Sequence, residues 1–389
     1  MEKRELELYV HIPFCVKKCA YCDFLSHPSG REEQSAYIDA LLTEIAGRSK
    51  NYIDCRVSTV FLGGGTPSIL DGDDTARIFH ALREHFDISE DAEITMEVNP
   101  GTASEEKLKA WRQCGINRLS IGLQSANDKE LRMLGRIHTY HTFLETFRLA
   151  REAGFDNINV DLISAIPGQT CSSWENTLRT VAELGPEHIS AYSLIIEEGT
   201  PFYERYGKGG GFPPLPGEEE ERAIYERTAD LLEEYGYHRY EISNYAKEGC
   251  QCRHNLGYWE RKEYLGLGLG ASSLVGEQRF HNTQDIQKYI RLFGSGRQAA
   301  EDEIREEEET LSLQEQMEEY MFLGLRKTEG ITEEGFFQSF HRPFSEVYGE
   351  TAGKLEEKGL LVRRDGRVYL TGRGIDISNY VFAEFLFDR

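Results

Sequence analysis

Three cysteines close to the amino terminus constrain this chain more than any other feature. Cys15, Cys19 and Cys22 stand at the spacing C-x3-C-x2-C in the run HIPFCVKKCAYCDF, directly after an apolar, β-like stretch at residues 6–12. Proteins that only carry electrons usually hold an iron–sulfur cluster with four cysteines. Three thiolates can hold such a cluster and leave one iron without a protein ligand. The spacing therefore favours a site that binds a small molecule at iron.

A structural zinc site is the main alternative for these cysteines. Zinc would need a fourth Cys or His nearby, and His11 and His27 are both close in the sequence. Disulfides are a weaker alternative, because eight cysteines in 389 residues are too few for a disulfide-stapled domain. The start MEKRELELYV lacks the long apolar core of a signal peptide. We therefore expect free thiols in a reducing cytoplasm.

The charge of the chain excludes some classes of partner. The net charge is −23, from 44 basic and 67 acidic residues. Repulsion from polyanions disfavours unspecific binding to nucleic acid or to anionic lipid, so we expect no nucleic-acid partner. No apolar run approaches the roughly 18 residues that a spanning helix needs, so an integral membrane protein is not expected either. Apolar residues make up 39% of the chain, which suits a globular core.

Short apolar strands alternate with amphipathic helices as far as about residue 200. The expected strands are residues 6–12, 57–62, 93–98, 116–122, 157–163 and 188–194. The expected helices are residues 34–48, 73–86, 105–113, 142–153 and 173–184. Alternation of this kind predicts a parallel sheet with right-handed crossovers. Six units are visible rather than eight, so the predicted fold is an α/β partial (β/α)6 barrel, not a closed eight-fold barrel.

Composition divides the chain into three predicted units. Residues 1–206 form the partial barrel, and a Gly/Pro-rich loop at 207–221 opens a second unit, 207–309, which extends the barrel. Within it, the runs CRHNLGYW and EYLGLGLGASS are predicted as Gly-rich loops. The acidic run AEDEIREEEE at 300–309 is predicted as a solvated helix start or linker.

The third predicted unit, residues 310–389, has a different character. It reads as three helices followed by a hairpin whose turn, Asp365-Gly366, is a strong signal between two short strands. This pattern predicts an α+β, helical, winged-helix-like domain. The helix before the hairpin, FSEVYGETAGKLEEKG, carries more acids than bases. A DNA-reading helix would be basic, so we expect a packing or partner role.

A glycine-rich turn follows the second expected strand, in the run FLGGGTPS. Gly64 and Gly65 let the backbone approach a ligand closely. The turn matches neither G-x-G-x-x-G nor G-K-[ST], so a nucleotide-phosphate cradle is not expected. The turn can instead hold the amino group of an amino-acid-like ligand through carbonyls and the Thr66 hydroxyl.

Polar residues also occur at the ends of later strands, where active sites of parallel α/β folds collect. Taken singly, each residue can also have a purely structural role, such as accepting a hydrogen bond from a backbone donor. Together they favour one polar pocket. They are Glu97 in MEVNPG, Gln124 in SIGLQS, Arg136 in LGRIH and Asp161 in NVDLIS.

These motifs together resemble the radical S-adenosylmethionine (radical-SAM) superfamily, in the branch of oxygen-independent coproporphyrinogen III oxidase. The resemblance covers nearly the whole chain. It implies a 4Fe-4S cluster on Cys15, Cys19 and Cys22, with SAM bound at the open iron. The residues that match the SAM-binding positions are Tyr9, Tyr21, Gly64, Gly65, Thr66, Glu97, Gln124, Arg136 and Asp161.

Within that branch the chain resembles the HemW family of heme chaperones more than the oxidase. The oxidase pattern continues to C-x3-C-x2-C-x-C, whereas this chain has Phe24 at the last position, and only eight residues precede Tyr9. The HemW resemblance implies that the chain binds heme and transfers it to acceptor proteins, with an electron donor such as a flavodoxin or ferredoxin. Two alternatives stay open: the oxidase reaction, and a radical-SAM enzyme that degrades heme. Whether SAM is cleaved stays open as well.

The run RHNLGYW contains the candidate heme ligand. His254 can serve as an axial ligand to iron, with Tyr258 and Trp259 stacked on the macrocycle. Taken without the resemblance, a histidine bonded to its own protein and two core aromatics would be the more common arrangement. The nearby Cys250 and Cys252 are expected to be ordinary thiols, since the heme-attachment pattern C-x-x-C-H does not occur.

Overall fold

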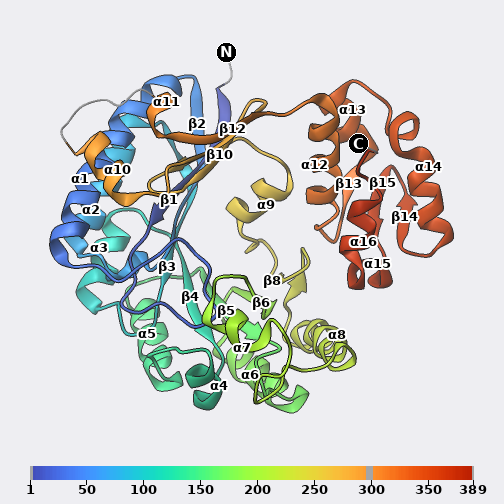
Figure 1. The fold of residues 1–389 in the computed structure, drawn as a ribbon, viewed down its shortest axis with the longest axis horizontal. Helices are drawn as coiled ribbons and strands as arrows, with labels where there is room; N and C mark the ends of the chain where they lie inside the picture. Colours follow the sequence, from blue (N-terminus) through green and yellow to red (C-terminus); the bar gives the residue numbers. More distant parts are fainter. Residues whose placement is uncertain (1–2, 295–300, 388–389) are drawn as a thin grey trace.

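The computed structural model describes residues 3–294 and 301–387. Its main feature is a curled twelve-stranded sheet in the order β12-β11-β10-β9-β1-β2-β3-β4-β5-β6-β8-β7 (Figure 1). The first six strands along the chain are parallel neighbours, as the sequence predicts. They are β1 (Arg4–Ile12), β2 (Cys55–Gly64), β3 (Ile88–Val98), β4 (Arg118–Gln124), β5 (Ile158–Ser164) and β6 (His188–Ser193).

Helices cover the outer face of these strands (Figure 1). Hydroxyl caps fix where three of them begin, because Ser104, Thr139 and Thr170 each accept a hydrogen bond from a backbone N–H in the first turn. Strand β4 is buried along its whole length, as expected for a parallel strand covered on both faces. The helices of this part are α1 (Arg31–Arg48), α2 (Gly72–His85), α3 (Glu105–Gln113), α4 (Asp128–Met133), α5 (Tyr140–Glu152), α6 (Cys171–Leu184), α7 (Pro201–Tyr206) and α8 (Glu218–Glu234).

Further strands extend the sheet at both ends, and the opening between the ends remains unclosed. At one end β9 runs parallel to β1, and β10, β11 and β12 follow antiparallel; at the other, β8 pairs antiparallel with β6. These elements are β7 (His238–Arg239), β8 (Asn244–Ala246), β9 (Tyr264–Leu267), β10 (Ser272–Val275), β11 (Gln278–Asn282), α10 (Ile286–Phe293), α11 (Glu301–Ile304) and β12 (Arg305–Thr310).

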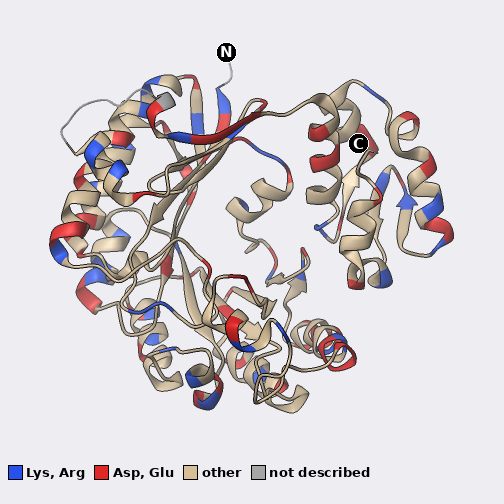
Figure 2. Cartoon of the chain, viewed as in Figure 1, with Lys and Arg blue, Asp and Glu red and all other residues tan. Residues whose placement is uncertain are grey.

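Three predictions for this region differ from the structure. The run EYLGLGLGASS is not a loop throughout, because Tyr264–Leu267 form strand β9 and β10 begins at Ser272. The run CRHNLGYW is not a loop: it forms helix α9 (Arg253–Trp259), which lies in the opening of the curled sheet (Figure 1). The acidic run at 300–309 begins as helix, since α11 covers Glu301–Ile304, but residues 305–309 belong to strand β12 and are not a linker; Figure 2 shows this acidic edge. Residue 300 lies outside the described residues. Charged side chains are common on edge strands because they oppose pairing with other chains.

Residues 311–387 build a second hydrophobic core, separate from that of the sheet. Strands β14 and β15 form the predicted hairpin, in which Asp365 (φ 52°) and Gly366 (φ 74°) make the turn; β13 adds a third strand. The elements are α12 (Leu313–Gly324), β13 (Ile331–Thr332), α13 (Glu333–Phe340), α14 (Phe344–Glu357), β14 (Leu361–Arg364), β15 (Arg367–Leu370), α15 (Gly372–Asp376) and α16 (Ser378–Ala383).

This second core docks beside the opening of the sheet (Figure 1). Arg261, just after α9, forms a 2.9 Å ion pair with Glu319 of α12, and the backbone N–H of Thr328 donates to the carbonyl of Tyr240 at 3.0 Å. The guanidinium of Arg326 lies 4.4 Å from the ring centre of Trp259. No helix in the described part of the chain has both the length and the apolar character needed to cross a bilayer.

Candidate functional site

The three cysteines of the motif lie on one loop between β1 and α1, at the carboxyl edge of the sheet. Two backbone hydrogen bonds close the loop at its base: Cys15 N–H donates to the His27 carbonyl at 3.1 Å, and His27 N–H donates to Pro13 at 2.9 Å. Cys22 N–H donates to the Cys19 carbonyl at 3.3 Å, which makes a tight turn between these two residues. All three thiols are free.

These thiols fit an iron–sulfur cluster through their chemistry. Thiolates are the soft ligands that such clusters prefer. Burial raises the pKa of the Cys15 and Cys22 thiols, so loading of metal would release protons. Nowhere in the described residues do three His, Cys, Asp or Glu side chains already converge on one point.

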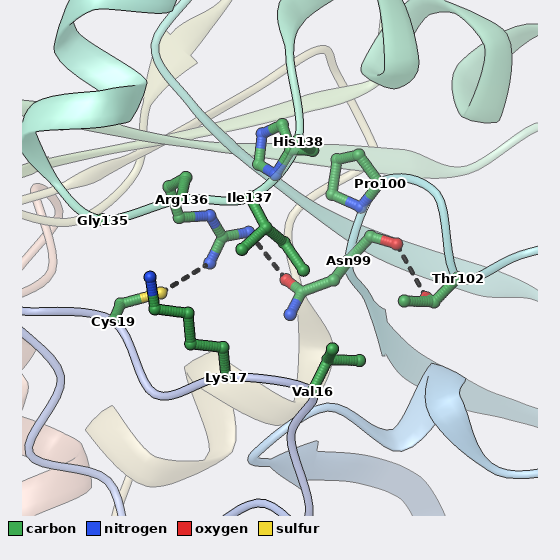
Figure 3. A pocket seen from close by; sticks show the side chains of 10 residues that line it. All are labelled: Val16, Lys17, Cys19, Asn99, Pro100, Thr102, Gly135, Arg136, Ile137 and His138. Carbon is green, nitrogen blue, oxygen red and sulfur yellow. Dashed lines mark hydrogen bonds between the residues drawn. The ribbon is translucent and has the colours of Figure 1, made fainter.

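Arg136 connects the cysteine loop to the ends of the strands (Figure 3). Its guanidinium donates to the sulfur of Cys19 at 3.6 Å, to the side-chain oxygen of Asn99 at 2.8 Å and to the carbonyl of Gly122 at 2.9 Å. The amide nitrogen of Asn99 in turn donates to the hydroxyl of Thr66 at 2.8 Å. One continuous network therefore joins the cysteine loop, the glycine turn and the end of β3.

Contacts with the β1 end explain the glycines of the GGGTP turn. Gly64 has φ of 114°, and a Cβ there would lie 2.5 Å from the ring of His11. A Cβ on Gly65 would lie 2.6 Å from the carbonyl oxygen of Phe14. Only glycine allows this approach of the two backbones. The Gly64 N–H donates to the Glu97 carboxyl group at 3.0 Å, so the turn is also tied to β3.

Two half-buried carboxyl groups stand at the predicted strand ends. Burial, with a smaller contribution from the nearby charge of Asp161, raises the pKa of Glu97 to about 8. Burial also raises the pKa of Asp161, although Ser120 and Asn159 donate to its two oxygens at 2.9 and 2.7 Å. Glu97 is therefore largely protonated at neutral pH and can donate a hydrogen bond.

An inner cavity of about 160 Å³ brings together several predicted residues. Tyr9, Glu97, Asp161 and His254 all line it. Cys19 and Arg136 line a separate small pocket (Figure 3). Gln124, in a left-handed conformation (φ 75°), lies near Arg136, and Tyr21 packs against Phe202 with a 6.5 Å ring separation.

Comparison with known proteins identifies the family. The radical SAM superfamily profile matches residues 9–181, and the HemN C-terminal domain profile matches residues 311–377. The heme chaperone HemW of Lactococcus lactis is 37% identical over 380 residues, which cover 98% of this chain and 97% of that protein. The HemW of Bacillus subtilis is also 37% identical, over 97% of this chain and 98% of its own length. This chain belongs to the HemW family of radical-SAM proteins.

The fold of this HemW-family chain also matches a solved enzyme. Coproporphyrinogen III oxidase (HemN) from Escherichia coli superposes with a TM-score of 0.83 at 26% identity, over 99% of this chain and 91% of that one. These comparisons confirm the predicted resemblance to the radical-SAM superfamily and the HemW family. They also confirm the predicted α/β fold with a helical C-terminal unit.

His254 of this HemW-family chain lies inside the protein and both ring nitrogens have partners. Its Nδ1 is 2.7 Å from the Thr59 hydroxyl, and its Nε2 is 3.0 Å from the Tyr258 hydroxyl. Its ring stacks on Phe61 at 5.2 Å. Burial lowers the pKa of His254 to about 3, so the ring is neutral. The neutral form is the one that binds metals, but Nε2 must leave Tyr258 to do so.

Sequence reasoning missed three residues that organise the site. Asn99 could have been predicted, because it follows an expected strand in the polar run EVNPG, as Glu97 does. Glu93 accepts hydrogen bonds from the first backbone N–H groups of α9, and Arg118 lines the inner cavity. Neither gave a sequence signal, because a charged residue at the start of a strand usually faces solvent.

Proposed function

We propose that this chain binds heme and passes it to acceptor proteins, and that it carries a 4Fe-4S cluster and SAM. The observation that carries the proposal is the 37% identity to two heme chaperones over nearly the full length of both chains. The matched region includes the C-terminal unit as well as the barrel, so the similarity to these chaperones extends beyond one shared domain.

We assign the cluster to the thiols of Cys15, Cys19 and Cys22. When bound and reduced, the cluster would be a source of one electron for SAM, the chemistry by which such cofactors can cleave its carbon–sulfur bond. The chain's own residues do the positioning. Gly64 and Gly65 leave room for a ligand close to the backbone, and Asn99 holds the Thr66 hydroxyl.

Polar residues of the strand ends complete the proposed SAM site. Protonated Glu97 can donate a hydrogen bond to a ligand oxygen, and Asp161 can accept one. Arg136 fixes the end of β4 against the cysteine loop. The other residues in the proposed site are Tyr9, Tyr21 and Gln124.

We propose His254 as the heme ligand. This residue belongs to helix α9, which lies in the opening of the curled sheet (Figure 1), and its ring centre is 4.8 Å from that of Tyr258. Iron binding would replace the 3.0 Å hydrogen bond between Nε2 and Tyr258. Trp259 faces Arg326 of the C-terminal unit, so stacking of Trp259 on a macrocycle would displace that guanidinium.

The remaining proposals concern partners and surroundings. Heme-acceptor proteins receive the heme, and a flavodoxin or ferredoxin supplies electrons. An oxygen-sensitive cluster on free thiols suits a reducing cytoplasm. We further propose three functional units, at residues 1–206, 207–309 and 310–389, in which the first holds the cluster and SAM and the second the heme ligand.

The oxidase reaction is the second candidate, because the HemN fold superposes over 99% of this chain. One residue argues against it. Phe24, 60% exposed, stands where the oxidase pattern continues with a further cysteine.

One side-by-side assay separates the two candidates. Cluster-loaded protein is given heme in one arm, and coproporphyrinogen III with SAM and a reductant in the other. We expect a Soret band that moves to an added apo-hemoprotein, and no protoporphyrinogen. Formation of protoporphyrinogen would reject the chaperone proposal, and loss of heme to linear tetrapyrroles would favour the heme-degrading alternative.

A further inference from the structure

The first residue of β4, Arg118, carries a buried charge that no protein group neutralises directly. The residue is 2% exposed. Among the residues that the structure describes, its guanidinium has neither a hydrogen-bond partner nor an ion pair within 4.0 Å, and its Nε is fully enclosed. A buried cation is costly unless it is paired and hydrogen-bonded. A ligand is the natural partner for the five N–H donors of such a group.

The nearest carboxylates already serve other donors. Glu93 accepts from the Cys252 thiol at 3.4 Å and from the backbone N–H groups of Arg253 and His254 at 3.0 and 3.1 Å. Both oxygens of Glu93 therefore hold the start of helix α9. The Glu93 carboxylate still acts on Arg118 at a distance, because it is among the groups that raise the pKa of that guanidinium against the effect of burial. Glu93 thus lies near the arginine without accepting a hydrogen bond from it.

The oxygens of Asp161 also accept hydrogen bonds from groups other than Arg118. One of its oxygens accepts from Ser120 at 2.9 Å and the other from Asn159 at 2.7 Å. Asn159 in turn accepts from Ser190 at 3.1 Å and lies 2.6 Å from Nδ1 of His188. This network is complete without Arg118.

Open space lies in front of Arg118. The residue lines the inner cavity of about 160 Å³, together with His188, Tyr240 and Asn244. In the register of the sheet Arg118 pairs with Thr95, whereas Glu97 pairs with Ser120. Arg118 is therefore farther from the carboxyl edge than the proposed SAM residue Glu97. The volume of the cavity has room for a short acid chain.

Asp161 faces this space as a carboxylate that accepts from Ser120 and Asn159, whereas the two histidines and Glu97 are uncharged at neutral pH. Burial lowers the pKa of His188 well below its ordinary value and that of His254 to about 3. Burial raises the pKa of Glu97 to about 8. Arg118 is thus the positive charge of the cavity, and a planar guanidinium pairs best with a carboxylate, through two parallel hydrogen bonds.

We propose that Arg118 forms a carboxylate-binding site at the inner end of the barrel cavity. The carboxylate belongs either to a free short-chain acid or to the acid arm of a porphyrin. The second source rests on the proposed heme function, and the first does not. In both cases the ligand would lie next to the residues proposed to hold SAM, so the site would decide which molecules can approach that cofactor.

The test uses the full chain and two pairs of probes. Propionate is compared with propionamide by thermal shift and calorimetry, and heme is compared with heme dimethyl ester by Soret titration. The variants are Arg118→Gln, Arg118→Lys and, as the matched control, Arg56→Gln at an exposed arginine of β2. The wild-type comparisons need no variant, so they remain decisive even where Arg118→Gln fails to fold.

We expect propionate to bind at least tenfold more tightly than propionamide, and Arg118→Gln, but not Arg56→Gln, to remove the difference. Arg118→Lys should keep only part of it. Heme binding at least tenfold tighter than that of its diester identifies the porphyrin arm, whereas equal binding of these two, with propionate still preferred, identifies a free acid. Equal binding within both pairs overturns the proposal. Heme that does not bind at all refutes the proposed function, and the propionate pair then still decides the carboxylate site.

Discussion

The raised pKa of Glu97 predicts an unusual dependence of stability on pH. The ordinary pKa of this carboxyl is near 4.5, and the folded protein raises it to about 8. Between these two pH values the folded chain holds a proton that the unfolded chain has released. Stability therefore falls as the pH rises through this window, which is the opposite of the usual behaviour of a carboxylate.

The size of the effect follows from the gap between the two pKa values. At about 1.4 kcal/mol for each pKa unit, the gap corresponds to at most about 5 kcal/mol of lost stability above pH 8. Glu97→Gln removes the titration and keeps an oxygen to accept from the Gly64 N–H. Between pH 6 and 9 the variant should gain up to about 3 kcal/mol relative to the wild type.

Urea unfolding of the cluster-free protein at several pH values measures this gain. Glu106→Gln, at an exposed position of α3, is the matched control, because it removes the same charge without any burial. Its free energy of unfolding should follow the wild type at every pH. If Glu97→Gln also follows the wild type, Glu97 is not held protonated in the folded protein, and the assignment of a donor role to this residue fails.

Three further variants test other parts of the site. Gly65→Ala should destabilise the protein by about 1–3 kcal/mol and prevent SAM binding, because its Cβ would lie 2.6 Å from the Phe14 carbonyl; unfolding and SAM calorimetry measure this. Cys22→Ser should lose the cluster, seen as loss of bound iron after anaerobic reconstitution, and unchanged iron content would refute its role. Tyr258→Phe frees Nε2 of His254 and should raise heme affinity up to about fivefold, since a hydrogen bond worth about 1 kcal/mol no longer competes. His254→Ala should lower that affinity, and an unchanged Soret titration in both variants would exclude His254 as the ligand.

The sequence predicts the barrel well because its strands and helices alternate with clear periodicity. The carboxyl ends of parallel strands meet at one edge, so Glu97 and Asp161 could be predicted to share a pocket, and both line the inner cavity. Helix α9 could not be predicted in the same way. Its seven residues are too few to show a helical period, and Gly257 argues against helix. The glycine leaves room for the Glu7 carboxyl group, since a Cβ there would lie 2.0 Å from its oxygen.

Strand β12 and Arg118 show a second limit of sequence reasoning. Four successive glutamates at 306–309 have low strand propensity, and only pairing with β11 makes them extended. Arg118 looks like an ordinary surface charge until the curled sheet encloses it. In both cases tertiary contacts override the local pattern, and contacts between distant segments leave no periodic signal in the sequence.

The central claim is that three cysteines hold a 4Fe-4S cluster with one iron open to SAM. Mössbauer and EPR spectra of the anaerobically reconstituted protein, recorded with and without SAM, test it most directly. We predict a cluster signal that changes on addition of SAM and that Cys22→Ser abolishes. A protein without such a cluster, or a cluster whose spectrum SAM leaves unchanged, would contradict the account.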